Sequence, residues 1–289
     1  MSNQLSGDAS QRLHAIMATA ITDSRGRSWT ASDLFKLLEA NEIRPFVAGG
    51  AIRDAIRGVE PNDLDIVAAG HIAQTAAVLR RELGKDSLLI FNEPLGSLRV
   101  GSSHKSYLDI GMFRDIESIG DEKSFIDVHW AYSGDPASDA KTTDFAINAM
   151  YWRADDGLVD PSGRGFTDAT DGILSVSADP RKLAIDMRLT LRMALFAAKG
   201  FQPTDSSREL FRSRIDVDLR TFGDTLPAYL EELTRGSAAA KTGIVGFCIG
   251  AGASRESCEL LARAAAETVD GYVSYWDAGH RDRETEEIA

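Results

Sequence analysis

Apolar and polar residues are patterned differently in the two halves of the chain. In the first half, short apolar runs of the kind found in strands occur at 46–48, 64–67, 88–90, 98–100 and 107–110. Helical spacing occurs there at 10–21, 33–40 and 72–83, and Thr30 or Ser32 can cap the second of these helices. The order of these signals predicts a mixed arrangement of strands and helices.

The second half has the pattern of a helical domain. Helical spacing covers 183–199, 206–214, 226–235 and 254–275, with Gly200 at the C-terminal end of the first helix. Residues 236–242 are predicted to be a linker and 277–289 a solvated tail. We therefore predict an α+β fold in three parts: a helical extension over 1–41, a domain with a mixed sheet over 42–160, and a helical domain over 161–289.

A glycine turn followed by two acidic residues is the most informative motif. Gly49 and Gly50 follow one apolar strand, and we expect Asp63 and Asp65 to lie two residues apart on the next strand. Residues two apart on a strand point to the same face, so we expect both carboxylates on one face. Such a pair is costly unless a cation neutralises it, and Mg²⁺ prefers oxygen ligands of this type. Because paired glycines let the backbone approach an anion, the motif predicts a site for a nucleoside triphosphate with Mg²⁺ or Mn²⁺.

This segment resembles the head domain of the tRNA nucleotidyltransferase and bacterial poly(A) polymerase family. The family pattern is Gly-Gly-x-x-Arg-Asp, a turn, and Asp-x-Asp on the next strand; the matching residues are Gly49, Gly50, Arg53, Asp54, Gly58, Pro61, Asp63 and Asp65. The resemblance covers roughly residues 42–235. It implies a polymerase-beta-like head followed by a helical neck, with Gly49, Gly50 and Arg53 holding the triphosphate.

A third acidic residue, Asp109, lies in the apolar run 107–110. The family has an acidic residue on the strand that follows Asp-x-Asp, then a short apolar run and Phe-Arg, which here are Phe113 and Arg114. Asp109 is therefore either a third catalytic carboxylate or a surface residue of its strand. In the first case it assists the metals or accepts the proton of the attacking hydroxyl.

Residues 185–198 resemble the family helix that reads the nucleotide base, and Asp186 and Arg192 fall on its matching positions. A glutamate and two arginines of that helix are aliphatic here, at Ile185, Leu189 and Leu195. Arg188 is displaced by one residue, about 100° around a continuous helix. Asp186 and Arg192 either contact the base or form a structural ion pair.

The segment 144–150 resembles the family hinge, where we expect Asp144 and Asn148 to order the backbone. The family has two arginines directly before it, and here they are Thr142 and Thr143, which carry no charge. The net charge is −12, and little sequence follows the neck-like helices. We therefore expect a small or short acceptor rather than a full tRNA, because RNA affinity depends on cationic contacts to phosphates.

The sequence thus predicts a metal-dependent nucleotidyltransferase that moves a nucleoside monophosphate from a triphosphate to an acceptor hydroxyl, with release of pyrophosphate. One alternative is a minimal CCA-adding or RNA 3′-tailing enzyme, with RNA as a possible but not favoured partner. The other is a nucleotide-binding module without turnover. The base, the acceptor and the oligomeric state stay open.

Composition sets outer limits on these interpretations. The chain has 289 residues, of which 43% are hydrophobic and 26% charged, as expected for a globular protein, and we expect a cytoplasmic one. The N-terminus lacks a secretory signal, and the apolar stretch 243–253 is too short to span a bilayer, so no membrane partner is expected. Cys248 and Cys258 are predicted to be ordinary, partly buried thiols.

Overall fold

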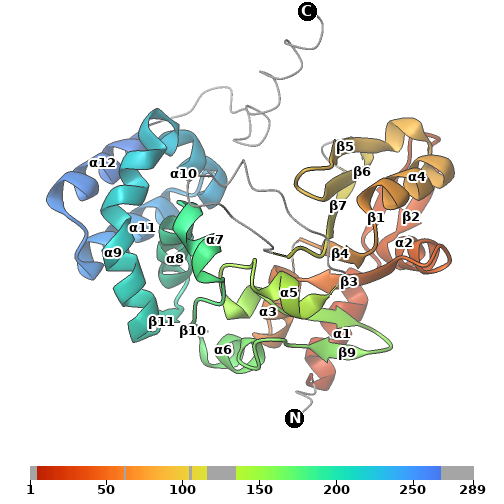
Figure 1. Cartoon of the computed structure of the whole chain (residues 1–289), viewed down its shortest axis with the longest axis horizontal. Coiled ribbons are helices and arrows are strands. Elements are labelled where there is room, and N and C mark those ends of the chain that lie inside the picture. The colour runs from red at the N-terminus through yellow and green to blue at the C-terminus, as the bar shows by residue number, and fades with distance from the viewer. Residues whose placement is uncertain (1–4, 62, 104–105, 116–134, 268–289) are drawn as a thin grey trace, which may run out of the picture. The chain divides into compact units, whose positions relative to one another are not determined.

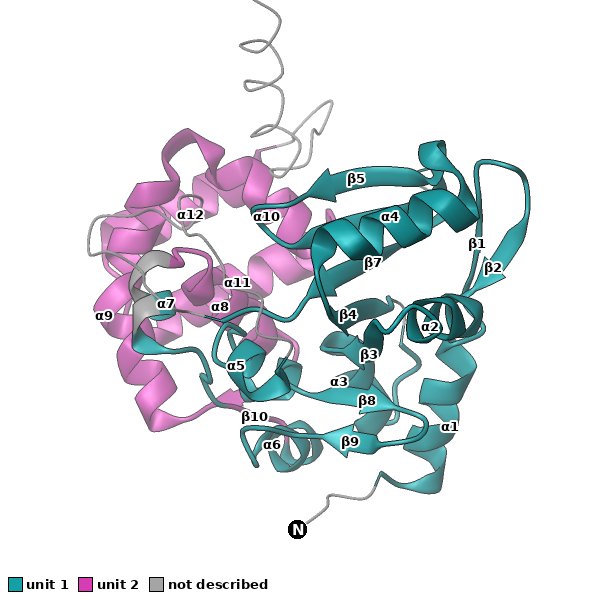
Figure 2. Cartoon of the chain, turned by 45° about the vertical axis from the view of Figure 1, so that its right-hand side comes forward, with its two compact units in different colours: residues 1–171, 175–185 teal, residues 172–174, 186–289 magenta. Residues whose placement is uncertain are grey.

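The computed structural model describes residues 5–61, 63–103, 106–115 and 135–267 (Figure 1). Two compact units make up the chain: unit 1 comprises 1–171 and 175–185, and unit 2 comprises 172–174 and 186–289 (Figure 2). Unit 1 contains a mixed sheet with helices, whereas the described residues of unit 2 form helices and one short strand pair. The predicted α+β class is confirmed, while the boundaries at 41 and 160 stay predictions.

Unit 1 is built on a seven-stranded sheet with the order β5-β6-β7-β4-β3-β8-β9. Its strands are β3 (Arg44–Ala48), β4 (Asp65–Ala69), β5 (Leu88–Asn92), β6 (Ser97–Ser103), β7 (Ser106–Met112), β8 (Tyr151–Arg153) and β9 (Gly157–Val159). Among the described strand pairs of this sheet, β4 and β7 are parallel and the others are antiparallel. All five strands predicted from apolar runs are confirmed.

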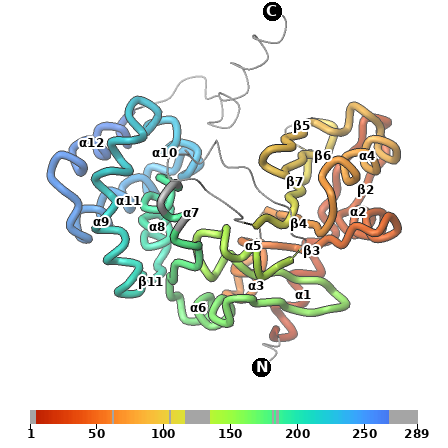
Figure 3. The backbone as a smooth tube through the Cα atoms, viewed as in Figure 1, coloured from red at the N-terminus to blue at the C-terminus, as the bar shows by residue number. Residues whose placement is uncertain are grey.

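The helices of unit 1 are α1 (Gly7–Ile16), α2 (Ala31–Glu39), α3 (Gly50–Ile56), α4 (Ile72–Leu83), α5 (Pro136–Ala140), α6 (Gly165–Asp171) and α7 (Pro180–Ile185). Helix α1 packs beside α3 although α2 and β3 separate them in the sequence (Figure 3). Helix α4 covers the sheet face that carries Leu108, Ile110 and Met112, and its Thr75 hydroxyl contacts the Met112 sulfur at 3.8 Å. The opposite face is thereby left for Asp109, which alternates with these residues.

The first predicted helix is wrong at its C-terminal end. A hairpin of β1 (Ala20–Thr22) and β2 (Ser28–Thr30) follows α1, where the sequence predicted helix to residue 21. The Asp23 carboxylate closes the hairpin by accepting hydrogen bonds from the Arg27 backbone and side chain and from Trp29 Nε1. Burial would raise the pKa of Asp23, but these hydrogen bonds lower it to about 2. The hairpin forms because the Asp23 side chain accepts the hydrogen bonds that the turn offers.

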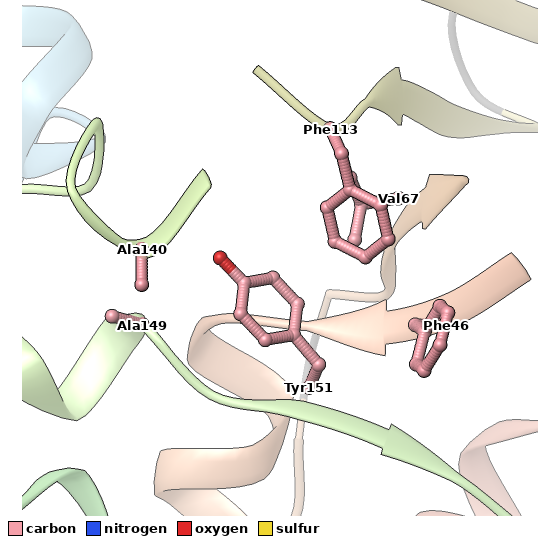
Figure 4. Packing of buried hydrophobic residues seen from close by; sticks show 6 residues of the cluster. All are labelled: Phe46, Val67, Phe113, Ala140, Ala149 and Tyr151. Carbon is pink, nitrogen blue, oxygen red and sulfur yellow. The ribbon is translucent and has the colours of Figure 1, made fainter. Parts of the chain in front are cut away.

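A buried cluster joins the central strands to α5 (Figure 4). It consists of Phe46, Val67, Phe113, Ala140, Ala149 and Tyr151. The Phe113 ring lies 5.4 Å from that of Phe46 and 5.2 Å from that of Tyr151, and the Tyr151 hydroxyl donates to Asp139 at 2.7 Å. Burial raises the pKa of both Tyr151 and Asp139. The cluster lies on the same sheet face as Asp65, because Val67 is two residues further along β4.

Unit 2 contains α8 (Leu189–Ala198), α9 (Asp205–Phe222), α10 (Leu226–Thr234), α11 (Ala238–Ala251) and α12 (Arg255–Ala266), with β10 (Ile173–Leu174) parallel to β11 (Gln202–Pro203). The predicted linker 236–242 is wrong from residue 238 onward, because Ser237 caps α11 there. The predicted tail 277–289 lies outside the described residues. Cys258 is partly buried, as predicted, whereas Cys248 is fully buried. Among the described helices, none has the length and apolar character needed to cross a membrane.

Candidate active site

The glycine turn lies against the Asp65 carboxylate. Strand β3 ends at Ala48, which pairs with Asp65, the first residue of β4. Gly49 follows with φ +67° and ψ −128°. A Cβ atom at Gly49 would lie 3.9 Å from Asp65 Oδ2 and 3.8 Å from the Asn148 carbonyl oxygen. Backbone without a side chain is therefore next to an exposed carboxylate, as an anion-binding turn beside a metal site requires.

Replacing Gly49 by alanine tests this arrangement. The positive φ should destabilise the fold by about 1–3 kcal/mol, and the new methyl group should also obstruct the space beside Asp65. Gly163→Ala is the matched control, because Gly163 has φ +66° and a methyl group there would meet nothing within 4 Å. Urea unfolding should show similar losses for the two variants, whereas pyrophosphate release should fall further only for Gly49→Ala. Equal effects on turnover would contradict a role for the turn.

The structure brings Asp65 and Asp109 together. Asp109 on β7 is in register with Asp65 on the parallel strand β4, so both lie on one face. Asp63 is exposed but precedes β4, so the expectation that it lies on the strand is wrong. Pairing of β4 with β3 begins only where Asp65 meets Ala48.

Arg99 binds the third carboxylate. Arg99 Nε lies 2.7 Å from Asp109 Oδ1 and Arg99 Nη2 lies 2.9 Å from Asp109 Oδ2. The sequence placed Arg99 on a predicted strand but indicated no role for it. Its alternation with the apolar residues Leu98 and Val100 was the available signal that it faces away from the core.

The donor set fits a divalent cation held in part by substrate. Within the described residues, no group of three His, Cys, Asp or Glu side chains is arranged to hold a metal ion. Mg²⁺ usually binds through one or two carboxylates together with substrate phosphates and water. The exposed carboxylates of Asp63 and Asp65 supply oxygens of that kind.

Arg53 links the glycine turn to the hinge segment. Its Nε donates to Asp54 at 2.8 Å and its Nη1 to Asn148 Oδ1 at 2.6 Å. Asn148 Nδ2 in turn donates to Asp144 at 3.1 Å. The guanidinium lies against Gly50, where a Cβ would be 3.3 Å from Nη2. Asp144 and Asn148 therefore order this region, and Arg53 is held in a fixed position with its side chain 13% exposed.

The predicted continuous helix 183–199 is wrong. Helix α7 ends at Ile185 and α8 begins at Leu189, so Asp186 lies in a break. The Asp186 carboxylate accepts hydrogen bonds from the Arg188 backbone at 3.1 Å and from its guanidinium at 2.8 and 3.0 Å. Because the backbone is not helical here, the 100° displacement inferred for Arg188 does not apply. Arg192 lies in the first turn of α8, and its N–H donates to the Arg188 carbonyl at 3.0 Å.

The Asp186–Arg188 pair is a buried ion pair. Their side chains are 6% and 16% exposed. Burial alone would lower the pKa of Arg188, but the Asp186 carboxylate raises it, and the net shift is upward. Arg214 joins the group by donating to the Asp186 carbonyl at 3.3 Å and to Asp218 at 3.0 Å. This part of unit 2 is therefore organised by charge pairing.

A comparison with known protein families matches the part of unit 1 that contains the glycine turn. Residues 45–175 match the model of the poly(A) polymerase head domain. The tRNA nucleotidyltransferase cca2 of Schizosaccharomyces pombe is 25% identical over 178 residues, covering 56% of this chain and 36% of that protein. The multifunctional CCA protein of Neisseria gonorrhoeae is 28% identical over 181 residues, covering 60% of this chain and 40% of that protein. The chain thus spans well under half the length of these curated relatives.

Solved structures show the same fold. The Bacillus stearothermophilus CCA-adding enzyme in complex with CTP has a TM-score of 0.55 and 17% identity, covering 84% of this chain and 54% of that one. The Thermotoga maritima CCA-adding enzyme complexed with tRNA has a TM-score of 0.57 and 21% identity, covering 75% of this chain and 49% of that one. Residues 45–175 are therefore similar to the poly(A) polymerase head domain, and the chain shares a fold with CCA-adding enzymes.

Proposed function

We propose that the chain transfers a nucleoside monophosphate from a nucleoside triphosphate to an acceptor hydroxyl and releases pyrophosphate. The observation that carries this proposal is the Gly49 turn placed directly beside the Asp65 carboxylate. The names of its relatives, which are tRNA nucleotidyltransferases and CCA-adding enzymes, support the same class of reaction.

Each residue of the unit 1 site then has a part in the transfer. Asp63 and Asp65 would hold Mg²⁺ or Mn²⁺, which when bound activates the attacking hydroxyl and neutralises the leaving pyrophosphate. Gly49 and Gly50 let the backbone approach the triphosphate, and Arg53, fixed by Asn148, supplies a cation beside that turn. Asp109 is our candidate acceptor for the proton of the attacking hydroxyl. As that proton leaves, the hydroxyl oxygen bonds to the α-phosphorus, and the bond from the α-phosphorus to the pyrophosphate leaving group breaks.

We propose Asp186 and Arg192 as the residues of unit 2 that contact the base. Arg188 donates to both carboxylate oxygens of Asp186. An ionised carboxylate has about four acceptor sites, so a carboxylate bound to one guanidinium can also accept from a base amine. The pairing with Arg188 would then fix the orientation of the Asp186 carboxylate.

A small or short acceptor is the more specific part of the proposal. Thr142 and Thr143 supply no cation at the hinge, and the Thr142 hydroxyl donates to the Asp139 carbonyl at 2.8 Å. The net charge of −12 also disfavours extended contact with phosphates. The second candidate is RNA tailing, which is favoured by relatives named for CCA addition and by a structural neighbour complexed with tRNA.

Binding of tRNA separates these two candidates. We expect a Kd weaker than about 10 µM at about 0.15 M salt, because few Lys and Arg contacts to phosphates are available. Fluorescence anisotropy with labelled tRNA, repeated across a salt series, measures this, and a short single-stranded RNA serves as the comparison. Sub-micromolar tRNA affinity that persists at about 0.15 M salt would instead support RNA tailing.

A further inference from the structure

We infer that Arg99 is a positioning residue that holds the Asp109 carboxylate away from the divalent cation while no nucleotide is bound, an inference that rests on the proposed function. In the absence of nucleotide, the metal site then consists of the Asp63 and Asp65 carboxylates. The third carboxylate, Asp109, is bound to the Arg99 guanidinium instead.

The side chains of Asp65, Asp109 and Arg99 form a row across neighbouring strands. Strand β7 lies between β4 and β6, and Asp109 is in register with Asp65 on one side and with Arg99 on the other. Residues in register share a face, so all three lie on the face opposite the buried Leu108 and Ile110. The guanidinium therefore approaches Asp109 from the strand on the side away from Asp65.

The geometry of Arg99 fixes it against Asp109. The guanidinium makes two parallel hydrogen bonds to the two carboxylate oxygens, of 2.7 and 2.9 Å. It also lies over the Tyr107 ring, 4.0 Å from the ring centroid. Tyr107 is two residues from Asp109 on β7 and so lies on the same face. The contacts with Asp109 and Tyr107 together hold the Arg99 guanidinium in one orientation.

Competition with a metal ion follows from these contacts. A carboxylate whose two oxygens both accept from a guanidinium is a poorer metal ligand, and the guanidinium repels a divalent cation nearby. The side chains of Arg99 and Asp109 are 26% and 40% exposed. Because this pair is open to solvent, a bound metal–nucleotide complex can displace the guanidinium and release the Asp109 carboxylate.

Direct Mn²⁺ binding tests the inference. The free Mn²⁺ signal in electron paramagnetic resonance gives the affinity of the full chain without nucleotide. Arg99→Met should bind Mn²⁺ about fivefold more tightly than the wild type, because a third carboxylate becomes available. Arg99→Lys keeps the charge but loses the paired hydrogen bonds of the guanidinium, so its Mn²⁺ affinity should lie between those of the wild type and Arg99→Met. The double variant with Asp109→Asn should lose the gain.

Arg44→Met is the matched control, since Arg44 forms an exposed 2.6 Å pair with Asp156 elsewhere in unit 1. Its Mn²⁺ affinity should equal that of the wild type. Pyrophosphate release is measured on the same proteins. If Arg99→Met and Arg99→Lys bind Mn²⁺ no more tightly while the wild type binds the ion and turns over, the role of Arg99 is wrong and the proposed function stands. If no protein binds Mn²⁺ or releases pyrophosphate, the proposed function fails and this inference fails with it.

Discussion

Asp65→Asn is expected to reduce pyrophosphate release by at least about a thousandfold, which corresponds to about 4 kcal/mol of transition-state stabilisation. The carboxylate is exposed at the start of β4 and in register with Asp109, so its loss removes a metal ligand and also some repulsion between like charges. Unit 1 should therefore stay folded, with an unchanged urea midpoint. Initial rates of pyrophosphate release with Mg²⁺ measure the effect.

Asp155→Asn is the control, because Asp155 is an aspartate of unit 1 with 84% of its side chain exposed. It should release pyrophosphate at the wild-type rate. Asp63→Ala should behave like Asp65→Asn if both carboxylates bind the metal. Near-normal turnover in either variant would contradict the proposed metal site.

Asp186→Ala is expected to lower the free energy of unfolding by about 3 kcal/mol. Removal of one partner leaves the Arg188 guanidinium buried without its carboxylate, and such losses typically cost about 3–5 kcal/mol. The substitution also removes the hydrogen bond to the Arg188 backbone at the start of α8. Urea denaturation followed by far-ultraviolet circular dichroism measures the change.

Glu259→Ala provides the comparison for Asp186→Ala. Glu259 pairs with Arg255 on the surface of α12, where the side chains are 59% and 92% exposed, so its loss should change stability by less than about 0.5 kcal/mol. A stable Asp186→Ala protein with an altered preference among the four nucleoside triphosphates would show that base contact, and not charge pairing, is the main role of Asp186.

Features coded by local patterns could be predicted from the sequence. Short apolar runs mark the strands because a buried strand needs consecutive apolar residues, and the glycine pair marks its turn because only glycine readily adopts φ +67°. Features that depend on one distant or cross-strand contact could not be predicted. Residues 20–22 fit a helix until Asp23 closes the hairpin, and the break at Asp186 depends on the fork of Arg188.

The role of Arg99 depends on a cross-strand contact and could not be predicted from the sequence. Arg99 and Asp109 are ten residues apart, and their pairing depends on the register of β6 and β7, which the sequence does not specify. The same applies to Asp65 and Asp109, since the parallel pairing of β4 with β7 brings together residues forty-four apart. The sequence indicated which residues carry charge, and the sheet determines which of them meet.

The most direct test of the central claim is pyrophosphate release from each of the four nucleoside triphosphates with Mg²⁺ and a short single-stranded RNA or a nucleoside as acceptor. We predict release by the wild type with at least one triphosphate, and loss of that release in Asp65→Asn. Equal release by the two proteins, or nucleotide binding by the wild type without any release, would contradict the proposed transfer.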